Sequence, residues 1–87
     1  MSMVGGNLEQ LDGLERSFHT ESQNVAQLVS RITTTINATT WLGPAAQRFK
    51  EDWTQNFSRS LAQLQQALDQ QAAFVANRRA AIATATN

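Results

Sequence analysis

The segment Trp41-Leu42-Gly43-Pro44, at the middle of the 87-residue chain, constrains the fold more than any other feature. Glycine adopts turn conformations that other residues resist. Proline is favoured at the first position of a helix, because its missing N–H would find no acceptor within that helix. Apolar residues recur at helical spacing on both sides of this segment. The sequence therefore predicts two helices joined by one turn.

An apolar heptad pattern runs through the first half of the chain. It consists of Leu11, Phe18, Val25 and Ile32, which recur every seven residues, and of Leu14 and Leu28, which follow members of that series by three. Val29 and Ile36 widen the stripe to about three positions per heptad, as in a helix that faces more than one neighbour. Asn7 and Gln10 have the spacing of a capping box at the helix start. We expect the first helix to span about residues 8–38.

The second half has a different apolar spacing. Phe49, Trp53, Phe57 and Leu61 follow one another in steps of four, and then Leu64, Leu68, Val75 and Ile82 settle into heptad-like spacing. The run of fours resembles a stutter, which locally relaxes left-handed supercoiling. Many alanines favour helix here and allow a neighbouring backbone to approach closely. We expect a turn at about 39–43 and a second helix at about 44–82, within one domain covering residues 1–87.

Two such helices form a thin antiparallel hairpin whose apolar stripes are too wide for the hairpin alone to cover. We expect Leu11, Phe18, Val25 and Ile32 to pack against Phe57, Leu61, Leu64 and Leu68. The sequence thus predicts an all-α helix-turn-helix hairpin that pairs with a second hairpin into a four-helix bundle. The candidate helix-packing and dimer-interface residues are Leu11, Leu14, Phe18, Val25, Leu28, Ile32, Phe49, Trp53, Phe57, Leu61, Leu64, Leu68 and Val75.

Composition disfavours several classes of function. The chain has no cysteine, which excludes disulfides and thiolate metal sites. Seven basic and seven acidic side chains cancel, so a partner held by charge, such as nucleic acid, is not expected. No segment approaches the roughly 20 apolar residues of a membrane-spanning helix, and residues 1–6 lack the pattern of a general secretory signal.

The sequence gives little support for catalysis. His19 is the only histidine, and no serine, cysteine or carboxylate pair stands at a spacing that suggests a triad or metal site. We interpret it as a solvated helix residue. The charged pairs Asp12–Arg16 and Arg48–Asp52 are four residues apart and are expected to stabilise their helices slightly. We therefore expect no catalytic, cofactor-binding or metal-binding residues, and no enzyme.

The turn Trp41-Leu42-Gly43, centred between amphipathic helices in a cysteine-free chain, resembles the WXG motif of the ESAT-6-like small proteins of type VII (ESX) secretion. The small residues after it, and then Phe49 and Trp53, strengthen this resemblance, which covers essentially the whole chain. The resemblance implies a hairpin that dimerises with itself or with a relative, and export through a membrane complex driven by an ATPase. Gly43 would permit the turn. Trp41 would dock at the end of the bundle, either as packing alone or also as part of an export signal.

The chain departs from the family at the second half of that signal. Many members carry a tyrosine four residues before an acidic residue after the second helix, whereas this sequence has no tyrosine. Its nearest analogue is Phe74 with Arg78, where the acidic position has become basic. A heterodimer whose partner supplies the tyrosine motif would resolve the departure, and so would a different export tail.

Two functions follow from the resemblance and the residues. The first is an exported substrate or carrier of type VII secretion, cytoplasmic before export and secreted without a cleavable signal peptide. The second is a structural module that is not exported and pairs with a helical region of a larger effector. A third hypothesis, membrane insertion by the amphipathic helices, is disfavoured because their polar faces are not enriched in lysine and arginine.

Overall fold

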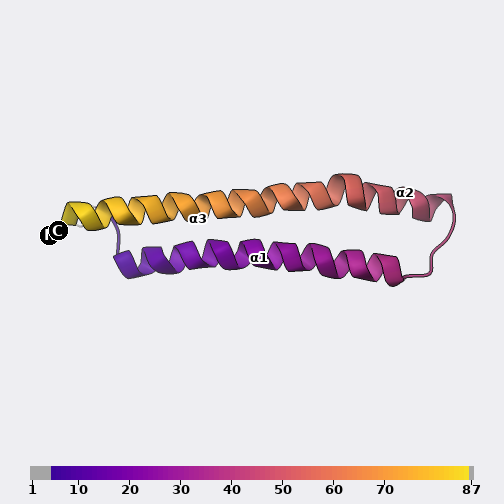
Figure 1. The fold of residues 1–87 in the computed structure, drawn as a ribbon, viewed down its shortest axis with the longest axis horizontal. Coiled ribbons are helices and arrows are strands. Elements are labelled where there is room, and N and C mark those ends of the chain that lie inside the picture. Colours follow the sequence, from indigo (N-terminus) through magenta and orange to yellow (C-terminus); the bar gives the residue numbers. More distant parts are fainter. Residues whose placement is uncertain (1–4, 87) are drawn as a thin grey trace.

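The computed structural model describes residues 5–86 and shows a helical hairpin. Helix α1 spans Leu8–Ala38. After the turn, helix α2 (Pro44–Asp52), a π-helical turn η1 (Trp53–Phe57) and helix α3 (Ser58–Thr86) follow one another. Figure 1 shows these three as one long rod antiparallel to α1. The predicted all-α architecture with two packed helices is confirmed, and the described residues contain no strand.

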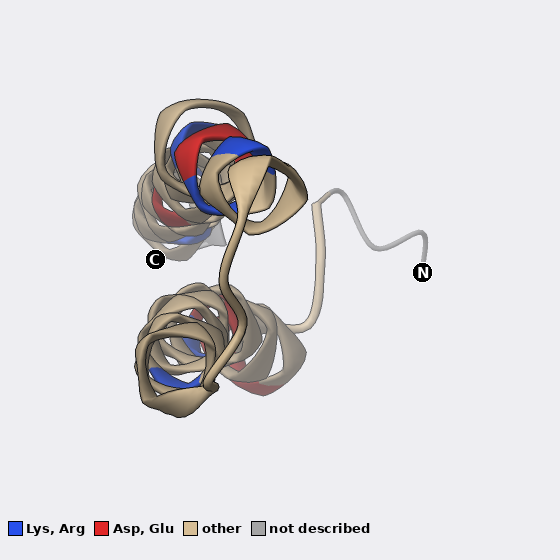
Figure 2. Cartoon of the chain, turned by 90° about the vertical axis from the view of Figure 1, so that its right-hand side faces the viewer, with Lys and Arg blue, Asp and Glu red and all other residues tan. Residues whose placement is uncertain are grey.

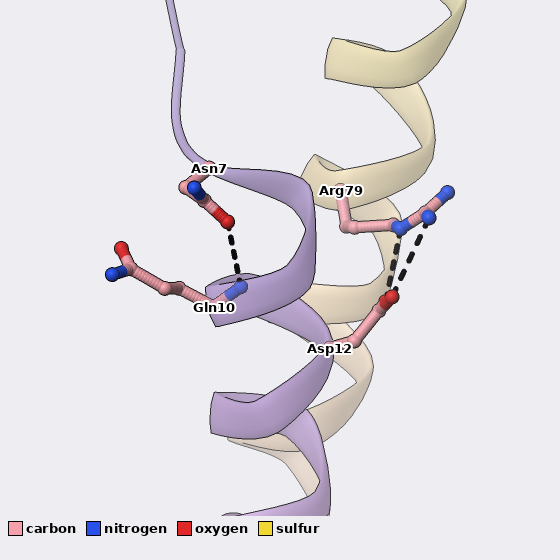
Figure 3. A network of polar contacts seen from close by, with 4 residues as sticks. All are labelled: Asn7, Gln10, Asp12 and Arg79. Carbon is pink, nitrogen blue, oxygen red and sulfur yellow. Dashed lines mark hydrogen bonds and ion pairs between the residues drawn. The ribbon is translucent and has the colours of Figure 1, made fainter.

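The start of α1 is capped by Asn7. Its side-chain Oδ1 accepts a hydrogen bond from the backbone N–H of Gln10 at 3.0 Å, which satisfies one of the free donors of the first turn. The side chain of Gln10 extends away from Asn7 (Figure 3), so the cap is the Asn7 half of the expected capping box. At the other end, the N–H of Thr39 donates to the carbonyl of Ile36 at 3.2 Å.

The turn depends on the backbone conformation of Gly43. Its φ of 109° lies in the region that side chains with a Cβ rarely adopt, although a Cβ there would meet nothing within 4 Å. Pro44 begins α2, and the N–H of Gln47 donates to the Gly43 carbonyl at 3.1 Å. Position 43 therefore requires glycine because of its positive φ, and not because a side chain there would clash with neighbouring atoms.

The π-helical turn is the main difference from the expected second helix. The N–H of Ser58 donates to the carbonyl of Trp53, five residues earlier, so this turn is wider than an α-helical turn. In an α-helix, residues four apart drift by about 40° per step, and a wider turn reduces that drift. The turn lies within the run of apolar residues spaced by four. The helix then continues to Thr86, beyond the end expected near residue 82.

The hairpin is a thin rod with little interior. Its extents are 66 × 17 × 16 Å, and its radius of gyration is 19.5 Å. A compact domain of this length has a radius of gyration of about 12 Å. The chain exposes 6674 Å² of surface, where a compact folded monomer of this mass exposes roughly 5,100 Å². This shape leaves more than roughly 1,000 Å² of additional surface in contact with solvent.

The buried residues are few and small. The buried apolar residues are Ala46, Ala72 and Val75, and no large side chain among the described residues is fully buried. Ser22 is the buried polar residue, and its Oγ donates to the backbone carbonyl of Gln65 on α3 at 3.2 Å. This contact between a short side chain and a backbone indicates that the two helices approach closely at their middle.

The seam between α1 and α3 uses a different set of residues from the one expected. On α1 it contains Leu8, Leu11, Phe18, Ser22, Val25, Val29 and Ile36, and on α3 it contains Leu61, Gln65, Leu68, Ala72 and Val75. The expectation that Ile32, Phe57 and Leu64 pack in this seam is wrong, because all three are exposed. Leu64 follows Leu61 by three residues, which places it about 60° around the helix, on the side of the seam.

Replacing Ser22 tests the close approach of the helices. We expect Ser22→Leu to lower the free energy of unfolding by about 1–3 kcal/mol, because the larger side chain cannot fit against the backbone of α3. Ser22→Ala should cost about 0.5–1.5 kcal/mol through the lost hydrogen bond. Denaturant unfolding followed by circular dichroism, at one protein concentration, measures both.

The matched control is Ser30→Leu, which makes the same change at an exposed position of the same helix. It should alter the free energy of unfolding by no more than about 0.5 kcal/mol. If Ser22→Leu were as stable as Ser30→Leu, the close contact at the middle of the seam would be contradicted.

Candidate functional site

An exposed apolar tip lies at the turn end of the hairpin. We define the tip as Trp41, Leu42 and Phe49. The rings of Trp41 and Phe49 contact each other with centroids 5.5 Å apart and planes inclined by 49°. Both side chains remain more than two-fifths exposed, and Leu42 is 86% exposed. Exposed apolar groups gathered in this way are typical of a contact surface and offer no chemistry for catalysis.

One side of the hairpin is closed by polar contacts between the helices. The guanidinium of Arg79 donates from Nε to Asp12 Oδ1 at 2.9 Å and from Nη2 to Oδ2 at 3.4 Å (Figure 3). His19 Nδ1 lies 3.4 Å from Asp69 Oδ1. The indole Nε1 of Trp53 donates to Thr33 Oγ1 at 2.9 Å. We call this side the polar flank: Asp12, His19, Thr33, Trp53, Asp69 and Arg79.

The polar flank changes two expectations. Asp12 pairs across the hairpin with Arg79 instead of along α1 with Arg16. His19 is half-exposed, as a solvated residue would be, but it also lies 3.9 Å from Glu15 and close to Asp69. The Asp12–Arg79 and His19–Asp69 contacts join residues that are far apart in the sequence. The pairs expected from the sequence were all within one helix.

The opposite side of the hairpin carries exposed apolar residues, and on α1 the exposed Glu21 lies one heptad from both Leu14 and Leu28. Two residues along an α-helix turn a side chain by about 200°, so Leu14 lies across α1 from Asp12. Leu64 is five residues from Asp69 and lies about 140° around α3 from it. Because the polar contacts between the helices put the polar columns of both helices on one side, the apolar columns share the other. We call this the apolar flank: Leu14, Leu28, Ile32 and Leu64, which are between 37% and 47% exposed.

The apolar residues predicted from the sequence are therefore divided among four places. Leu11, Phe18, Val25, Leu61, Leu68 and Val75 lie in the seam, and Leu14, Leu28, Ile32 and Leu64 lie on the apolar flank. Phe49 lies at the tip with Trp41 and Leu42. Trp53 is half-buried against α1, and the exposed Phe57 stacks on its ring with centroids 6.3 Å apart. Figure 2, which views the hairpin from its turn end, shows two helical columns, with the segment that precedes α1 running along one side of them.

The helix segment around Phe74 does not form an enclosed ligand-binding site. Phe74 is exposed, and Arg78 is exposed one turn later on the same face of α3. Arg79, which follows, is held by Asp12. A shallow groove of about 260 Å³ at the terminal end is lined by Gly5, Arg78, Ala81, Ile82 and Ala85. Arg78 is the only charged residue that lines this groove, and the other lining residues are apolar. This lining does not indicate which kind of ligand the groove would bind.

Sequence reasoning missed the residues of the polar flank other than Trp53. One signal was present, because Asp12, His19 and Thr33 differ by multiples of seven and so lie in one column of a heptad helix. The partners on α3 could not be assigned without knowing which columns of α3 face α1. Ser22 gave no signal, since a serine at a heptad position reads as an interruption of the stripe.

Two searches for other kinds of site were negative within the described part of the chain. Residues 5–86 contain no group of three or more histidine, cysteine, aspartate or glutamate side chains placed to hold a metal ion. No helix in the same range combines the length and the apolar character needed to cross a bilayer.

Comparison with known proteins gives no match. No family model matches the chain, and neither a curated protein nor a solved structure matches it.

The Asp12–Arg79 pair supplies a direct test of the polar flank. Both side chains are more than one-third exposed, so we expect Arg79→Gln to lower the free energy of unfolding by no more than about 1 kcal/mol. The loss should shrink at high salt, because salt screens exposed ion pairs. Arg78→Gln, a neighbouring exposed arginine, is the control and should cause no loss. Equal losses for the two variants would contradict the pairing.

Proposed function

We propose that this chain is a non-enzymatic small protein of a type VII (ESX) secretion system, exported as a substrate or carrier and acting as a helical dimer. The observation that carries the proposal is the Trp41-Leu42-Gly43 turn, placed at the exposed tip of a hairpin with almost no core of its own. The residues that resemble the WXG motif are thus the residues that the hairpin presents at its end.

The exposure of the tip supports a role in recognition. Trp41 contacts Phe49, which belongs to the same tip, and Leu42 is almost fully exposed. The polar contacts of the hairpin and its seam lie further along the rod. Large apolar side chains that pack little within their own chain are available to a partner. In this proposal that partner belongs to the secretion machinery, whose ATPase the resemblance implies.

No large side chain within residues 5–86 is fully buried, and this supports a partner hairpin. Either a second copy of this chain or a related WXG-type protein would cover the apolar flank. A related partner would also supply the tyrosine-containing half of the export signal that Phe74 and Arg78 do not reproduce. The protein would be cytoplasmic before export and would be secreted without a cleavable signal peptide.

The alternative proposal is a structural module that stays in the cell and pairs with a helical region of a larger effector. The same open flank would serve it, and the absence of a tyrosine motif favours it. The genes beside the coding sequence separate the two proposals. A secretion ATPase or a tyrosine-bearing sister gene favours export, whereas a long gene with a helical region favours the targeting module.

Replacing Trp41 tests the export proposal. In a bacterium with an active type VII system, we expect the wild-type chain in the culture medium, and we expect Trp41→Ala to reduce the secreted fraction at least about tenfold, a loss of about 1.4 kcal/mol in recognition. Helicity should be unchanged, because Trp41 lies outside the helices. Immunoblots of medium and cells measure the secreted fraction.

Gln47→Ala, at an exposed position of α2 next to the tip, is the matched control and should be secreted like the wild type. Normal secretion of Trp41→Ala would show that Trp41 serves only packing. Retention of the wild-type chain in a competent host that secretes its own substrates would contradict export and favour the targeting module.

A further inference from the structure

We propose that Trp53 is the positioning residue of the tip. The π-helical turn keeps its side chain on the side of the rod that faces α1, and its hydrogen bond to Thr33 fixes the rotation of α2. That rotation in turn places Phe49 against Trp41. This role is independent of secretion, and only its consequence for export rests on the proposed function.

The covered positions of the rod show that the π-helical turn takes one residue out of the helical register. From the tip toward the middle, the buried or half-buried positions are Ala46, Lys50, Trp53, Ser58, Leu61 and Gln65. They follow one another in steps of three or four residues, as in a helix packed on one neighbour, except for a step of five from Trp53 to Ser58. The backbone hydrogen bond of the π-helical turn joins the same two residues. The turn therefore holds one added residue, and the covered column continues on both sides of it.

The added residue sets the direction of the Trp53 side chain. In an uninterrupted α-helix, Trp53 and Leu61 are eight residues apart and would lie about 80° apart around the axis. Because the wider turn takes up one residue, they are related like residues seven apart, which differ by about 20°. Leu61 is half-buried in the seam, so Trp53 is also directed toward α1. Phe57 is left outside the covered column, where it is exposed and stacks on Trp53.

Trp53 links the turn end of the rod to α1. Helix α1 lies close to α3, whereas few positions of α2 and η1 have their backbone near α1. Within the described residues, one hydrogen bond or ion pair joins α1 to residues 44–57, and it runs from Trp53 Nε1 to Thr33 Oγ1 at 2.9 Å. Its length is that of a well-formed hydrogen bond, and the rigid indole ring fixes the direction of the donor. The bond therefore restrains the rotation of α2 about its axis.

The rotation of α2 determines where Phe49 lies. Phe49 precedes Trp53 by four residues, so the two side chains lie about 40° apart around the helix. A rotation that moved Trp53 away from Thr33 would also move Phe49 away from Trp41, whose ring centroid is 5.5 Å from its own. The hydrogen bond on α1 and the ring contact at the tip are thus coupled through one turn of helix.

The first experiment removes the hydrogen bond with little change in side-chain size. Thr33→Val should speed hydrogen exchange of the Trp53 indole N–H about three- to tenfold. It should also shift the Trp41 indole resonance and weaken the nuclear Overhauser contact between Trp41 and Phe49. Thr33→Ser keeps the hydroxyl group and should restore all three signals. The chain has two tryptophans, so the isotope-labelled indole spectrum contains two resonances, which Trp41→Phe assigns.

The matched control is Thr34→Val, which makes the same change at the adjacent exposed position of α1 and should leave both indole resonances unchanged. Trp53→Phe keeps an aromatic ring without the N–H and should displace the Trp41 signals as Thr33→Val does. If Thr33→Val freed the Trp53 indole but left the Trp41 signals as in the wild type, the packing of Ala46 would hold the tip and the proposal would be overturned. Equal exchange of the Trp53 indole in the wild type and in Thr33→Val would overturn it as well.

The second experiment tests the register. Deletion of Gln55 removes one exposed residue from the π-helical turn, which should then close as an α-helical turn with Trp53 still facing α1. The thermal midpoint should stay within about 5 °C of the wild type, and the Trp53 indole should keep its slow exchange. Deletion of Gln66, an exposed glutamine of α3, turns the rest of α3 by about 100° and should lower the midpoint by more than about 10 °C. Equal effects of the two deletions would overturn the added residue.

Export distinguishes this role from the proposed function. In a competent host that secretes the wild-type chain, Thr33→Val should lower the secreted fraction at least about threefold, and Thr33→Ser should not. Normal secretion of a Thr33→Val chain whose Trp41 signals have moved would overturn the consequence for export. Retention of the wild-type chain would contradict the proposed function, and the indole signals would still decide whether Trp53 positions the tip.

Discussion

Two helices alone cannot enclose an interior, and the rest of this structure depends on that constraint. Each helix covers one side of the other, so a side chain in the seam still meets solvent at its edge. The fully covered positions hold alanine, valine and serine, the residues small enough to lie between two close backbones. Larger apolar side chains stay partly exposed. The free energy that they would gain from burial, about 25 cal/mol per Å², is left for contact with another molecule.

The two flanks of the hairpin differ in the residues that they present to solvent. Contacts between charged or polar groups close one flank and fix the helices against each other. The other flank holds no such contacts and presents apolar side chains. The tip is a third surface, set by the positive φ of Gly43 and by the Trp41–Phe49 contact. The tip and the two flanks therefore consist of different residues.

Much of this fold follows from the sequence alone. The glycine-proline turn and the two apolar patterns give the hairpin, and α1 occupies the range expected for the first helix. The π-helical turn could not be predicted from the sequence. Apolar residues spaced by four differ from the 3.6-residue period of an α-helix, but the spacing does not show how the backbone accommodates that difference. The sequence also did not show which apolar columns face inward, because Leu61 and Leu64 look alike until the register of α3 against α1 is known. That register depends on Ser22 and Arg79, whose partners are distant in sequence.

We propose that the hairpin requires a second hairpin to be a stable fold. Light scattering and circular dichroism over a dilution series test it most directly, since folding that depends on a partner depends on concentration. We expect a helical particle of twice the 9.6 kDa chain mass at high concentration, with helicity falling as the mass falls. A particle of 9.6 kDa that keeps full helicity and unfolds cooperatively at every dilution would contradict the claim.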